Sequence, residues 1–437
     1  MQTDFSPAQL ADPATAQSEG AIRKCVHCGF CTATCPTYVL LGDELDSPRG
    51  RIYLMKEMLE AEAVPTAEVV KHIDRCLSCL ACTTTCPSGV DYMHLVDHAR
   101  AYIQNRYRRP WHERFVRGLL AYVLPSPSRF RMAIRLARFG RPFTGMLRSI
   151  DGLKPLAAML DLAPKSLAPP APLTSSPARM TRGRIVLLKG CAEPVLRPEI
   201  REAAVRLLNR SGFDVVFANG EACCGALVHH MGHEEASLAA ARRNVDAWTA
   251  ELNGEGLDAI VITASGCGTT IKDYGFMLRN DPAYARKAAR VSALAKDISE
   301  MLAAIELPAH VDRGIKVGYQ AACSLQHGQK VTEAPRRLLA SVGYDVRVPR
   351  DAHLCCGSAG TYNILQPQIA GELGRLKVGN LEELRADVIA TGNVGCATQI
   401  GAWTGVPVVH VVELLDWATG GPTPPAMIDR YSEGSQE

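Results

Sequence analysis

Apolar residues in the first part of the chain recur at helical spacing. Ser47 and Pro48 form an expected N-cap and first-turn proline, and Ile52, Met55 and Leu59 then share one face of a predicted helix. Polar residues occupy the positions between them. This part of the chain is therefore expected to be mainly helical.

Beyond residue 183 the rhythm changes, and short apolar runs alternate with helical patterns. Strands are predicted at residues 184–188, 214–217 and 258–263, and again at 316–319, 345–348 and 387–390. Helices are predicted between them, at residues 199–208, 334–341 and 369–384. Strands that alternate with helices predict parallel βα units, so the fold class is α+β multidomain, with a helical part before two α/β parts.

Cysteines repeat in step with these α/β patterns. Each half has a cysteine, then 32 residues later a Cys-Cys-Gly, then a fourth cysteine; the two sets are Cys191, Cys223, Cys224 and Cys267, and Cys323, Cys355, Cys356 and Cys396. An offset of 132 residues relates Cys191 to Cys323 and Cys223 to Cys355. We interpret this as an internal duplication.

The first part carries the other eight cysteines in two copies of one motif. Each copy is Cys-x-x-Cys-x-x-Cys-x-x-x-Cys-Pro, formed by Cys25, Cys28, Cys31 and Cys35 and by Cys76, Cys79, Cys82 and Cys86. This is the bacterial ferredoxin pattern for two [4Fe–4S] clusters. Disulfide frameworks belong to short secreted chains, and zinc sites seldom use this triple spacing twice, so neither alternative competes.

In this pattern the fourth cysteine of each run serves the other cluster. The expected grouping is therefore crossed, with Cys25, Cys28, Cys31 and Cys86 on one cluster and Cys76, Cys79, Cys82 and Cys35 on the second. About forty residues with helical spacing separate the two runs, which favours an α-helical ferredoxin over the compact hairpin type.

The eight cysteines of the duplicated half are a further candidate metal site. Adjacent thiolates bind one centre only where the backbone turns sharply, and the glycine after each Cys-Cys pair permits such a turn. Four thiolates per repeat suit an iron–sulfur cluster, a zinc site or a redox-active thiol pair. We favour a cluster.

Two other motifs are weaker candidates. His229, His230 and His233 could ligate a metal, but histidines of this kind more often lie on a surface or near a cluster. Residues 357–360 resemble a phosphate-binding turn only loosely, so a nucleotide site is not expected there.

Residues 100–148 form a strongly basic segment. They contain twelve arginines, no lysine and one acidic residue, Glu113. Arg131, Arg135 and Arg138 fall on one face of a predicted helix. The segment is either a docking surface for anionic lipid headgroups or an acidic partner, or a solvated face packed on the rest of the protein.

Length and composition bound the remaining possibilities. With 437 residues, 47% of them hydrophobic, the chain is expected to form two or three domains. Its net charge of +3 gives no argument for nucleic-acid binding. Apolar runs such as 118–124 and 259–263 are far shorter than the roughly 18 residues of a spanning helix. Dense unpaired thiols favour a reducing cytoplasm, and any membrane contact is expected to be peripheral.

Composition also predicts where the domains end. Proline, serine and alanine concentrate before the first expected strand, as in a linker, and the polar, alanine-rich N-terminus is expected to be an arm. The predicted parts are an N-terminal arm (1–20), an α-helical ferredoxin domain (21–99), a basic helical segment (100–162), a linker (163–183), a first α/β repeat (184–309) and a second α/β repeat with the tail (310–437).

The order of these motifs resembles a family of iron–sulfur subunits that serve flavin-dependent 2-hydroxyacid and glycerol 3-phosphate dehydrogenases, and it resembles heterodisulfide reductase subunits. It is most similar to the glycolate oxidase iron–sulfur subunits. The resemblance extends from about residue 20 to about residue 415, and the segments that carry it are CVHCGFC, DSPRGRI, CLSC, LCCGSAGTYN and GNVGC.

The resemblance implies a role and partners. In that family the subunit joins FAD-binding subunits that oxidise glycolate to glyoxylate, and it passes electrons toward a membrane acceptor such as quinone. It implies two [4Fe–4S] clusters on this chain, FAD only on the partners, no substrate site or catalytic residue here, and a location at the inner face of the cell membrane. Equivalent subunits serve lactate and glycerol 3-phosphate dehydrogenases.

One departure separates the chain from heterodisulfide reductase. Repeats of that type end in Cys-x-x-Cys, whereas here Thr270 and Gln399 stand where the fifth thiol would be. This favours plain electron transfer. The alternative is a catalytic subunit that itself reduces a disulfide or a quinone at its cysteines.

Overall fold

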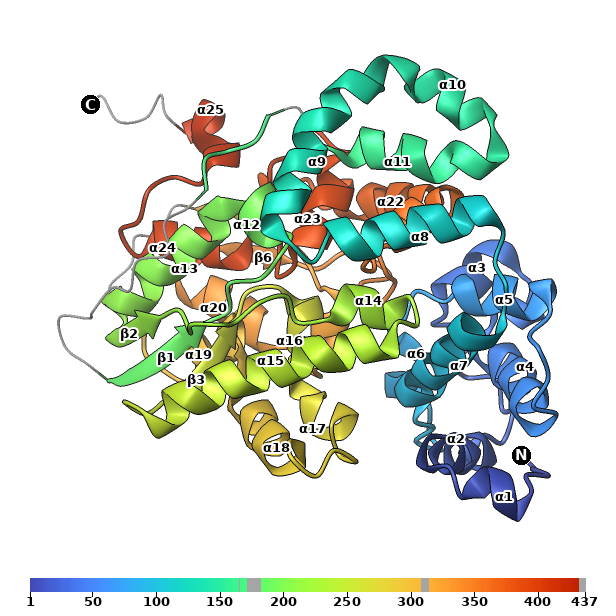
Figure 1. Cartoon of the computed structure of the whole chain (residues 1–437). Helices are drawn as coiled ribbons and strands as arrows, with labels where there is room; N and C mark the ends of the chain where they lie inside the picture. Colours follow the sequence, from blue (N-terminus) through green and yellow to red (C-terminus); the bar gives the residue numbers. More distant parts are fainter. Residues whose placement is uncertain (165, 171–181, 308–313, 432–437) are drawn as a thin grey trace, which may run out of the picture.

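The computed structural model describes residues 1–164, 166–170, 182–307 and 314–431. A helical N-terminal part, blue in Figure 1, lies beside two α/β units that each contain a parallel sheet, and a group of helices extends from it across both units. The predicted fold class is confirmed: a helical ferredoxin-like part precedes two duplicated α/β units.

The N-terminal part is made of helices joined by cysteine-bearing turns. Its elements are α1 (Pro7–Leu10), α2 (Pro13–Lys24), α3 (Pro36–Leu41), η1 (Glu44–Asp46), α4 (Pro48–Glu60), α5 (Ala67–Asp74), α6 (Ala81–Thr85) and α7 (Tyr92–Arg106). The Ser47 side chain caps α4 by accepting from the amide of Gly50, as predicted. Ile52, Met55 and Leu59 are buried in the core of this part.

Residues 1–20, expected to be an arm, pack against the ferredoxin part. The N-terminal ammonium of Met1 donates to the carbonyl of Cys25 at 2.6 Å. On α2, the buried Ser18 hydroxyl lies 2.7 Å from Nδ1 of His98 on α7. These contacts hold the N-terminus on the domain.

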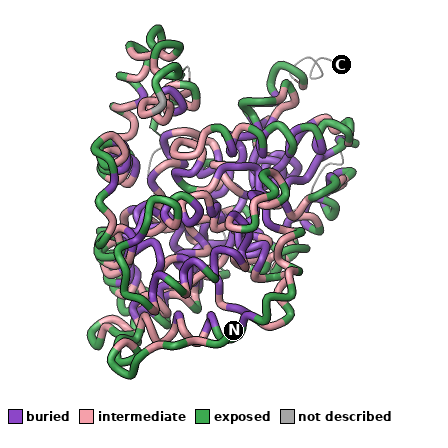
Figure 2. Tube along the Cα trace, turned by 90° about the vertical axis from the view of Figure 1, so that its right-hand side faces the viewer, coloured by how far each residue is buried: buried purple, intermediate pink, exposed green. Residues whose placement is uncertain are grey.

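A set of helices that we call the helical lobe (residues 111–162) follows α7. Its elements are α8 (Trp111–Val123), α9 (Pro127–Gly140), η2 (Arg141–Phe143), α10 (Thr144–Ser149), η3 (Asp151–Leu153) and α11 (Lys154–Leu162). Val116 and Leu120 pack on Val228 and Met231 of the first α/β unit. The far end of the lobe projects beyond the body at the top of Figures 1 and 2, where α10 is mostly exposed and α11 is mostly half-buried.

Three of the twelve arginines of residues 100–148 are buried, so they belong neither to a docking surface nor to a solvated face. Arg109 and Arg117 are buried and pair with Asp74 at 2.6 and 2.8 Å. Arg100 is also buried and donates to the Ser78 hydroxyl and to the carbonyl of Cys76. These three arginines attach α7 and α8 to the ferredoxin core, because a buried guanidinium needs partners.

Each α/β unit is built on a four-stranded parallel sheet. The strands are β1 (Gly183–Leu187), β2 (Phe213–Val216), β3 (Ala259–Ile262) and β4 (Ala295–Asp297), and then β5 (Lys316–Gln320), β6 (Asp345–Arg347), β7 (Val388–Thr391) and β8 (Val408–His410). The orders are β2-β1-β3-β4 and β6-β5-β7-β8, so the second sheet repeats the first. The predicted strands are present, and β4 and β8 are edge strands that the sequence did not reveal.

Helices surround both sheets. The first unit contains α12 (Glu193–Leu196), α13 (Pro198–Arg210), α14 (Ala226–His230), α15 (Glu234–Asn253), α16 (Ser265–Lys272), α17 (Tyr274–Met277), α18 (Ala285–Leu294) and α19 (Ile298–Ala303). The second contains η4 (Ser324–Gly328), α20 (Ala334–Ser341), α21 (Tyr362–Leu365), α22 (Pro367–Glu382), α23 (Val394–Gly401), α24 (Val411–Ala418), η5 (Pro425–Met427) and α25 (Ile428–Tyr431).

The two units share one core. Ile185 and Leu187 of β1 point into a cluster that also contains Val317 and Tyr319 of β5, whereas Val186 packs on the opposite face of its sheet. This alternation follows from the two-residue period of a strand. The shared core makes the duplicated units one rigid support for the cysteines at their strand ends.

Parts of two predicted boundaries lie outside the described residues. These are residues 165 and 171–181 of the predicted linker (163–183), and residues 308–313 around the boundary between the repeats. Within the described ranges, no helix has both the length and the apolar character needed to cross a bilayer.

Candidate metal centres

Two groups of four cysteines line two neighbouring cavities in the N-terminal part. We call Cys25, Cys28, Cys31 and Cys86 site 1, and Cys35, Cys76, Cys79 and Cys82 site 2. Site 1 lines an open cavity of about 440 Å³, and site 2 lines a second one of about 310 Å³; Cys82 borders both. Cys86 thus lies with the first cysteine run and Cys35 with the second, as crossed ligation requires, and the assignment of ligands to clusters stays a prediction.

The backbone forms the same turn in both runs. His27 and Gly29 have φ values of 57° and 86°, and Ser78 and Leu80, at the equivalent positions, have φ values of 50° and 63°. Left-handed residues at alternate positions fold three cysteines around one point. In the second run the amide of Ser78 donates to Sγ of Cys76 at 3.4 Å, a bond that stabilises a thiolate.

The two sites differ in exposure. All sixteen cysteines lie in the described part of the chain, and Cys28 alone is exposed. The exposed side chains of Val26 and Phe30 flank it. Cys35, Cys76, Cys79 and Cys82 are buried. Site 1 therefore faces solvent, whereas site 2 lies inside the protein.

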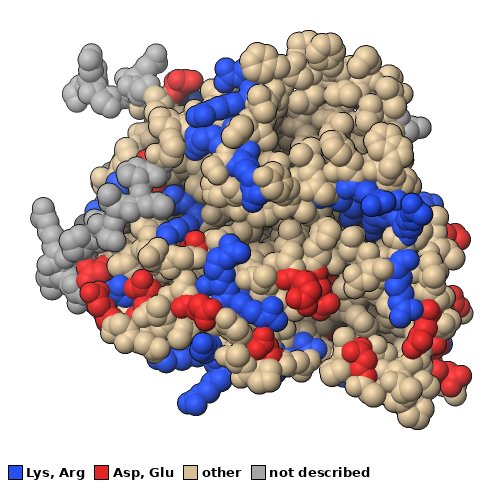
Figure 3. Space-filling model, viewed as in Figure 1, with Lys and Arg blue, Asp and Glu red and all other residues tan. Residues whose placement is uncertain are grey.

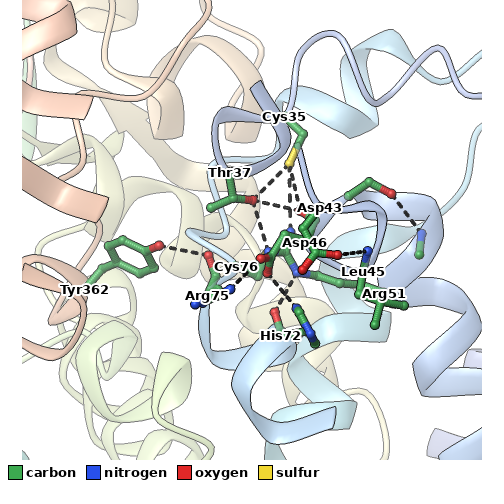
Figure 4. A network of polar contacts seen from close by, with 12 residues as sticks. Cys35, Thr37, Asp43, Leu45, Asp46, Arg51, His72, Arg75, Cys76 and Tyr362 are labelled. Atoms are coloured by element: carbon green, nitrogen blue, oxygen red, sulfur yellow. Dashed lines mark hydrogen bonds and ion pairs between the residues drawn. The ribbon is translucent and has the colours of Figure 1, made fainter. Parts of the chain in front are cut away.

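A buried polar network supports site 2 (Figure 4). The Asp46 carboxylate has no exposed surface and contacts Arg51 at 3.2 Å, His72 at 3.0 Å and Arg75 at 2.7 Å. Arg51 in turn donates toward Sγ of Cys35 at 3.8 Å. Two arginines pair with the single carboxylate of Asp46, so the network carries a net positive charge beside site 2.

The charge environment follows from these contacts. Burial by itself raises the pKa of the Cys76 thiol, but Arg51 and Arg100 outweigh it and lower that pKa below its usual value. At site 1, burial raises the pKa of the Cys31 thiol to about 11. The lowered pKa is particular to Cys76, because burial and neighbouring thiols raise the pKa values of Cys79 and Cys82 in the same site. Tyr92 adds a hydroxyl 3.7 Å from Sγ of Cys76.

The cysteines of each α/β repeat also come together. The first repeat site is Cys191, Cys223, Cys224 and Cys267, and the second repeat site is Cys323, Cys355, Cys356 and Cys396. Sγ of Cys223 lies 3.4 Å from Sγ of Cys191, and Cys224 contacts both Cys223 and Cys267. Cys355 lies 3.7 Å from Cys323, and Cys356 contacts Cys355 and Cys396.

Glycine makes these sites possible. Gly225 and Gly357 follow the Cys-Cys pairs with φ values of 87° and 88°. A Cβ at Gly357 would lie 2.5 Å from the carbonyl oxygen of Ala370. Cys267 and Cys396 lie in the first turns of α16 and α23 rather than in loops, where helix N-termini favour negative charge.

Site 2 packs directly against the second repeat site. Leu77 and Cys79 share a buried cluster with Cys323, Cys355 and Tyr362. The Tyr362 hydroxyl donates to the carbonyl of Arg75 at 2.9 Å, next to Cys76. Residues from the ferredoxin part and from the second repeat thus enclose both sets of thiols in one apolar region.

The two repeat sites also approach a common interface. Ser265, close to Cys267 on α16, lies 2.7 Å from the hydroxyl of Ser324, which follows Cys323. Gln329 donates to the carbonyl of Ser265 at 2.9 Å. The duplication therefore places the repeat sites on facing segments of the two units.

Comparisons with known proteins agree with this arrangement. Residues 21–90 match the 4Fe–4S dicluster domain family, and residues 185–272 and 317–401 match the cysteine-rich domain family. The chain is 41% identical over 419 residues to the glycolate oxidase iron–sulfur subunit of Escherichia coli, covering 96% of this chain and 99% of that one. The chain belongs to the glycolate oxidase iron–sulfur subunit family.

One further similarity concerns the sequence, and another concerns the fold. A probable glycolate oxidase iron–sulfur subunit of Bacillus subtilis is 33% identical over 430 residues, which cover 93% of this chain and 96% of that one. The crystal structure of a hypothetical protein from Helicobacter pylori superposes with a TM-score of 0.54 at 10% identity, covering 96% of this chain and 75% of that one. The second similarity concerns the fold alone.

Thr270 and Gln399 occupy the positions at which heterodisulfide reductase repeats have a fifth cysteine. Thr270 is buried and donates to the carbonyl of Gly266. Gln399 is buried and donates to the carbonyl of Ala370 at 2.9 Å. Both side chains are held by hydrogen bonds, so each repeat site offers four thiols.

Among the described residues, none of the candidate histidines belongs to a group of side chains that could hold a metal ion. His229 pairs with Asp97 of α7 at 3.1 Å, and His230 faces the same carboxylate. His233 is half-buried near Arg117 and Arg109, which together with burial lower its pKa. His229 and His230 thus connect α14 to Asp97 of the ferredoxin part.

Arg51 and Asp46 are residues that the cysteine motifs did not reveal. Arg51 precedes Ile52 on the buried face of α4, at a position where helical spacing predicts an apolar side chain. An arginine at a predicted core position indicates a buried partner, because an unpaired charge there is strongly destabilising. That signal was present in the sequence.

Proposed function

We propose that this chain is the electron-transfer subunit of a flavin-dependent 2-hydroxyacid dehydrogenase, most specifically of glycolate oxidase. The FAD lies on partner subunits that oxidise glycolate to glyoxylate, and the acceptor is a membrane carrier such as quinone. The observation that carries the proposal is the pair of neighbouring cysteine-lined cavities, one open to solvent and one packed on the second repeat site.

The residues fit two [4Fe–4S] clusters, held by site 1 and site 2. When bound, such clusters supply one-electron carriers whose potentials depend on burial and nearby charge. The chain's own side chains create these conditions. Cys28 leaves site 1 accessible to a partner, while Arg51, Tyr92 and the surrounding apolar residues hold site 2 in a buried, positively charged setting.

This order of sites suits a relay. Site 1 opens at the surface, site 2 lies deeper, and the second repeat site is in contact with site 2. A flavin subunit that docks beside Val26 and Phe30 reaches the exposed end of this series. The missing fifth thiols support electron transfer over disulfide reduction.

Copurification tests the proposed function. The intact complex, isolated anaerobically through a tag on this chain, is expected to contain FAD, iron and glycolate-dependent reductase activity. The chain alone is expected to contain iron but no flavin and to leave glycolate unoxidised. A chain that reduces a disulfide or a quinone with no flavoprotein present would contradict the proposal.

We also propose that the repeat sites hold metal, as iron–sulfur clusters rather than zinc or free thiols. Changing Cys355 and Cys356 to serine in the full chain is expected to lower its iron and acid-labile sulfide content while the ferredoxin signals persist. Metal analysis with electron paramagnetic resonance measures both. Unchanged iron, or loss of zinc instead, would show that the second repeat site holds no cluster.

The proposed location is the cytoplasmic side of the cell membrane, with peripheral attachment. Its support is the requirement for a membrane acceptor, together with the absence of a spanning helix in the described part of the chain. The attachment needs a surface that meets the membrane.

A further inference from the structure

Exposed apolar side chains are concentrated in the helical lobe. Nine of the twenty large hydrophobic side chains that are exposed in the described structure lie within residues 111–150; they are Trp111, Phe115, Tyr122, Met132, Leu136, Phe139, Phe143, Met146 and Ile150. Trp111 and Phe139 are 76% and 72% exposed. Such a concentration marks an interaction surface, whereas isolated exposed apolar residues do not.

Six of these side chains lie on the outer faces of α8 and α9, and the other three belong to η2, α10 and the residue after α10. On α9, Met132, Leu136 and Phe139 follow helical spacing and point outward, while Ile134 is buried on the opposite side. On α8 the inward residues Val116 and Leu120 pack on the first α/β unit. Each helix therefore has two apolar faces. One packs against the rest of the protein, and the other is exposed to solvent.

Positive charge accompanies the uncovered face. Arg114, Arg135 and Arg138 are exposed, and in the described part of the chain none of them has an acidic partner. Helix α9 contains no acidic residue. Lysine and arginine side chains gather over α8 in Figure 3, while the surface of α10 and α11 above it is largely uncharged. The face is thus apolar and cationic together.

Other arginines in the segment are already engaged. Arg131 donates to the carbonyls of Ala168 and Pro194, and Arg129 stacks over the ring of Tyr122. The sequence grouped Arg131 with Arg135 and Arg138 on one helix face. The structure removes Arg131 from this group, so Arg135 and Arg138 are the exposed arginines of that face.

Shape distinguishes the possible occupants. The lobe projects from the body of the molecule (Figures 1 and 2). Protein interfaces gather apolar side chains in a centre with a polar rim. On α9 the arginines instead alternate with Leu136 and Phe139, so apolar groups and charges meet the same surface. A bilayer interface with anionic headgroups accommodates both.

We propose that the helical lobe docks this subunit on a membrane surface that contains anionic lipid. Leu136, Phe139 and Trp111 enter the boundary between headgroups and acyl chains, and Arg135 and Arg138 contact lipid phosphates. The proposal rests on the proposed function, since docking here holds the electron-transfer subunit beside its membrane acceptor.

Vesicle cosedimentation tests the proposal. The full chain with its clusters is mixed anaerobically with vesicles of phosphatidylcholine alone or with added phosphatidylglycerol. We expect binding to the anionic vesicles that weakens with salt. The double change Leu136→Ser and Phe139→Ser is expected to lower binding about tenfold or more. Changing Arg135 and Arg138 to glutamine is expected to lower it about tenfold and to reduce its salt dependence.

Matched controls lie on other surfaces. Arg286→Gln with Arg290→Gln removes the same charge from α18, at the opposite end of the molecule in Figure 1, and Val64→Ser removes an apolar side chain that is 68% exposed. These variants are expected to bind like the wild type. Unchanged cluster absorption in every variant shows that the fold is intact.

Three outcomes would overturn the proposal. The wild type binds neither kind of vesicle, the lobe variants bind as well as the wild type, or the lobe variants lose the flavoprotein partner while vesicle binding is unchanged, which makes the lobe a protein interface. Failure of the proposed function looks different: the clusters then stay oxidised when a reduced flavoprotein is added to the wild type, whatever the vesicle result.

Discussion

Replacing Cys86 by alanine is expected to remove the cluster held by Cys25, Cys28 and Cys31 and to leave the cluster of Cys76, Cys79 and Cys82 in place. Cys86 lines the cavity of site 1, although it belongs to the second cysteine run. Roughly half of the ferredoxin iron should be lost, because each site holds one four-iron cluster. Iron analysis and the resonance of the remaining cluster measure the effect.

The mirror variant is the control. Cys35→Ala is expected to damage the cluster of site 2, since Cys35 lines the cavity with Cys76 and Cys79. The remaining signals of the two variants should therefore differ, one belonging to the exposed site and one to the buried site. If Cys86→Ala removed the buried cluster instead, the crossed grouping would be wrong.

Replacing Arg51 by methionine is expected to cost about 3–5 kcal/mol of stability, because it leaves the buried Asp46 carboxylate without one of its two arginines. Cluster binding at site 2 should weaken as well. In protein that keeps the cluster, its reduction potential is expected to fall, because a positive charge beside Cys35 favours the reduced, more negative state.

Chemical unfolding and redox titration separate the two effects. The control is Arg350→Met, which removes an ion pair with Glu383 in which both side chains are more than half exposed and is expected to cost less than about 1 kcal/mol. A change in the potential of site 1 equal to that of site 2 would indicate a general disturbance. An Arg51→Met protein as stable as the wild type would contradict the structural role of the network.

Local sequence signals predicted the architecture well. The strands of residues 184–188 and 316–319 and the helix after Ser47 form as expected, because spacing and capping act over a few residues. Edge strands such as β4 were not predicted. A strand of three residues has too few positions to show an alternating pattern, and it pairs only once the rest of the sheet has formed. The contacts of the N-terminal arm could not be predicted for the same reason, because Met1 and Ser18 are held by partners that are distant in the sequence.

For the candidate sites too, local sequence patterns predicted some features and tertiary packing determined the others. The cysteines could be found from spacing alone, and the structure brings them together at cavities and turns, while the assignment of ligands to each centre stays a prediction. The contact between Cys79 and Cys323 joins positions far apart in the chain and depends on how two domains pack. The arginines show another limit of sequence analysis. Composition identified residues 100–148 as basic, but only tertiary contacts determine that Arg117 is buried and Arg135 is exposed.

The central claim is that this subunit receives electrons from a flavoprotein on its cluster sites. Rapid freeze-quench electron paramagnetic resonance of the anaerobic complex after addition of glycolate tests it most directly. We predict that signals of reduced [4Fe–4S] clusters appear as the flavin is reoxidised, and that Cys86→Ala protein shows slower or no reduction of the buried cluster. Flavin that is reduced and reoxidised by the acceptor while all clusters stay oxidised would contradict the account.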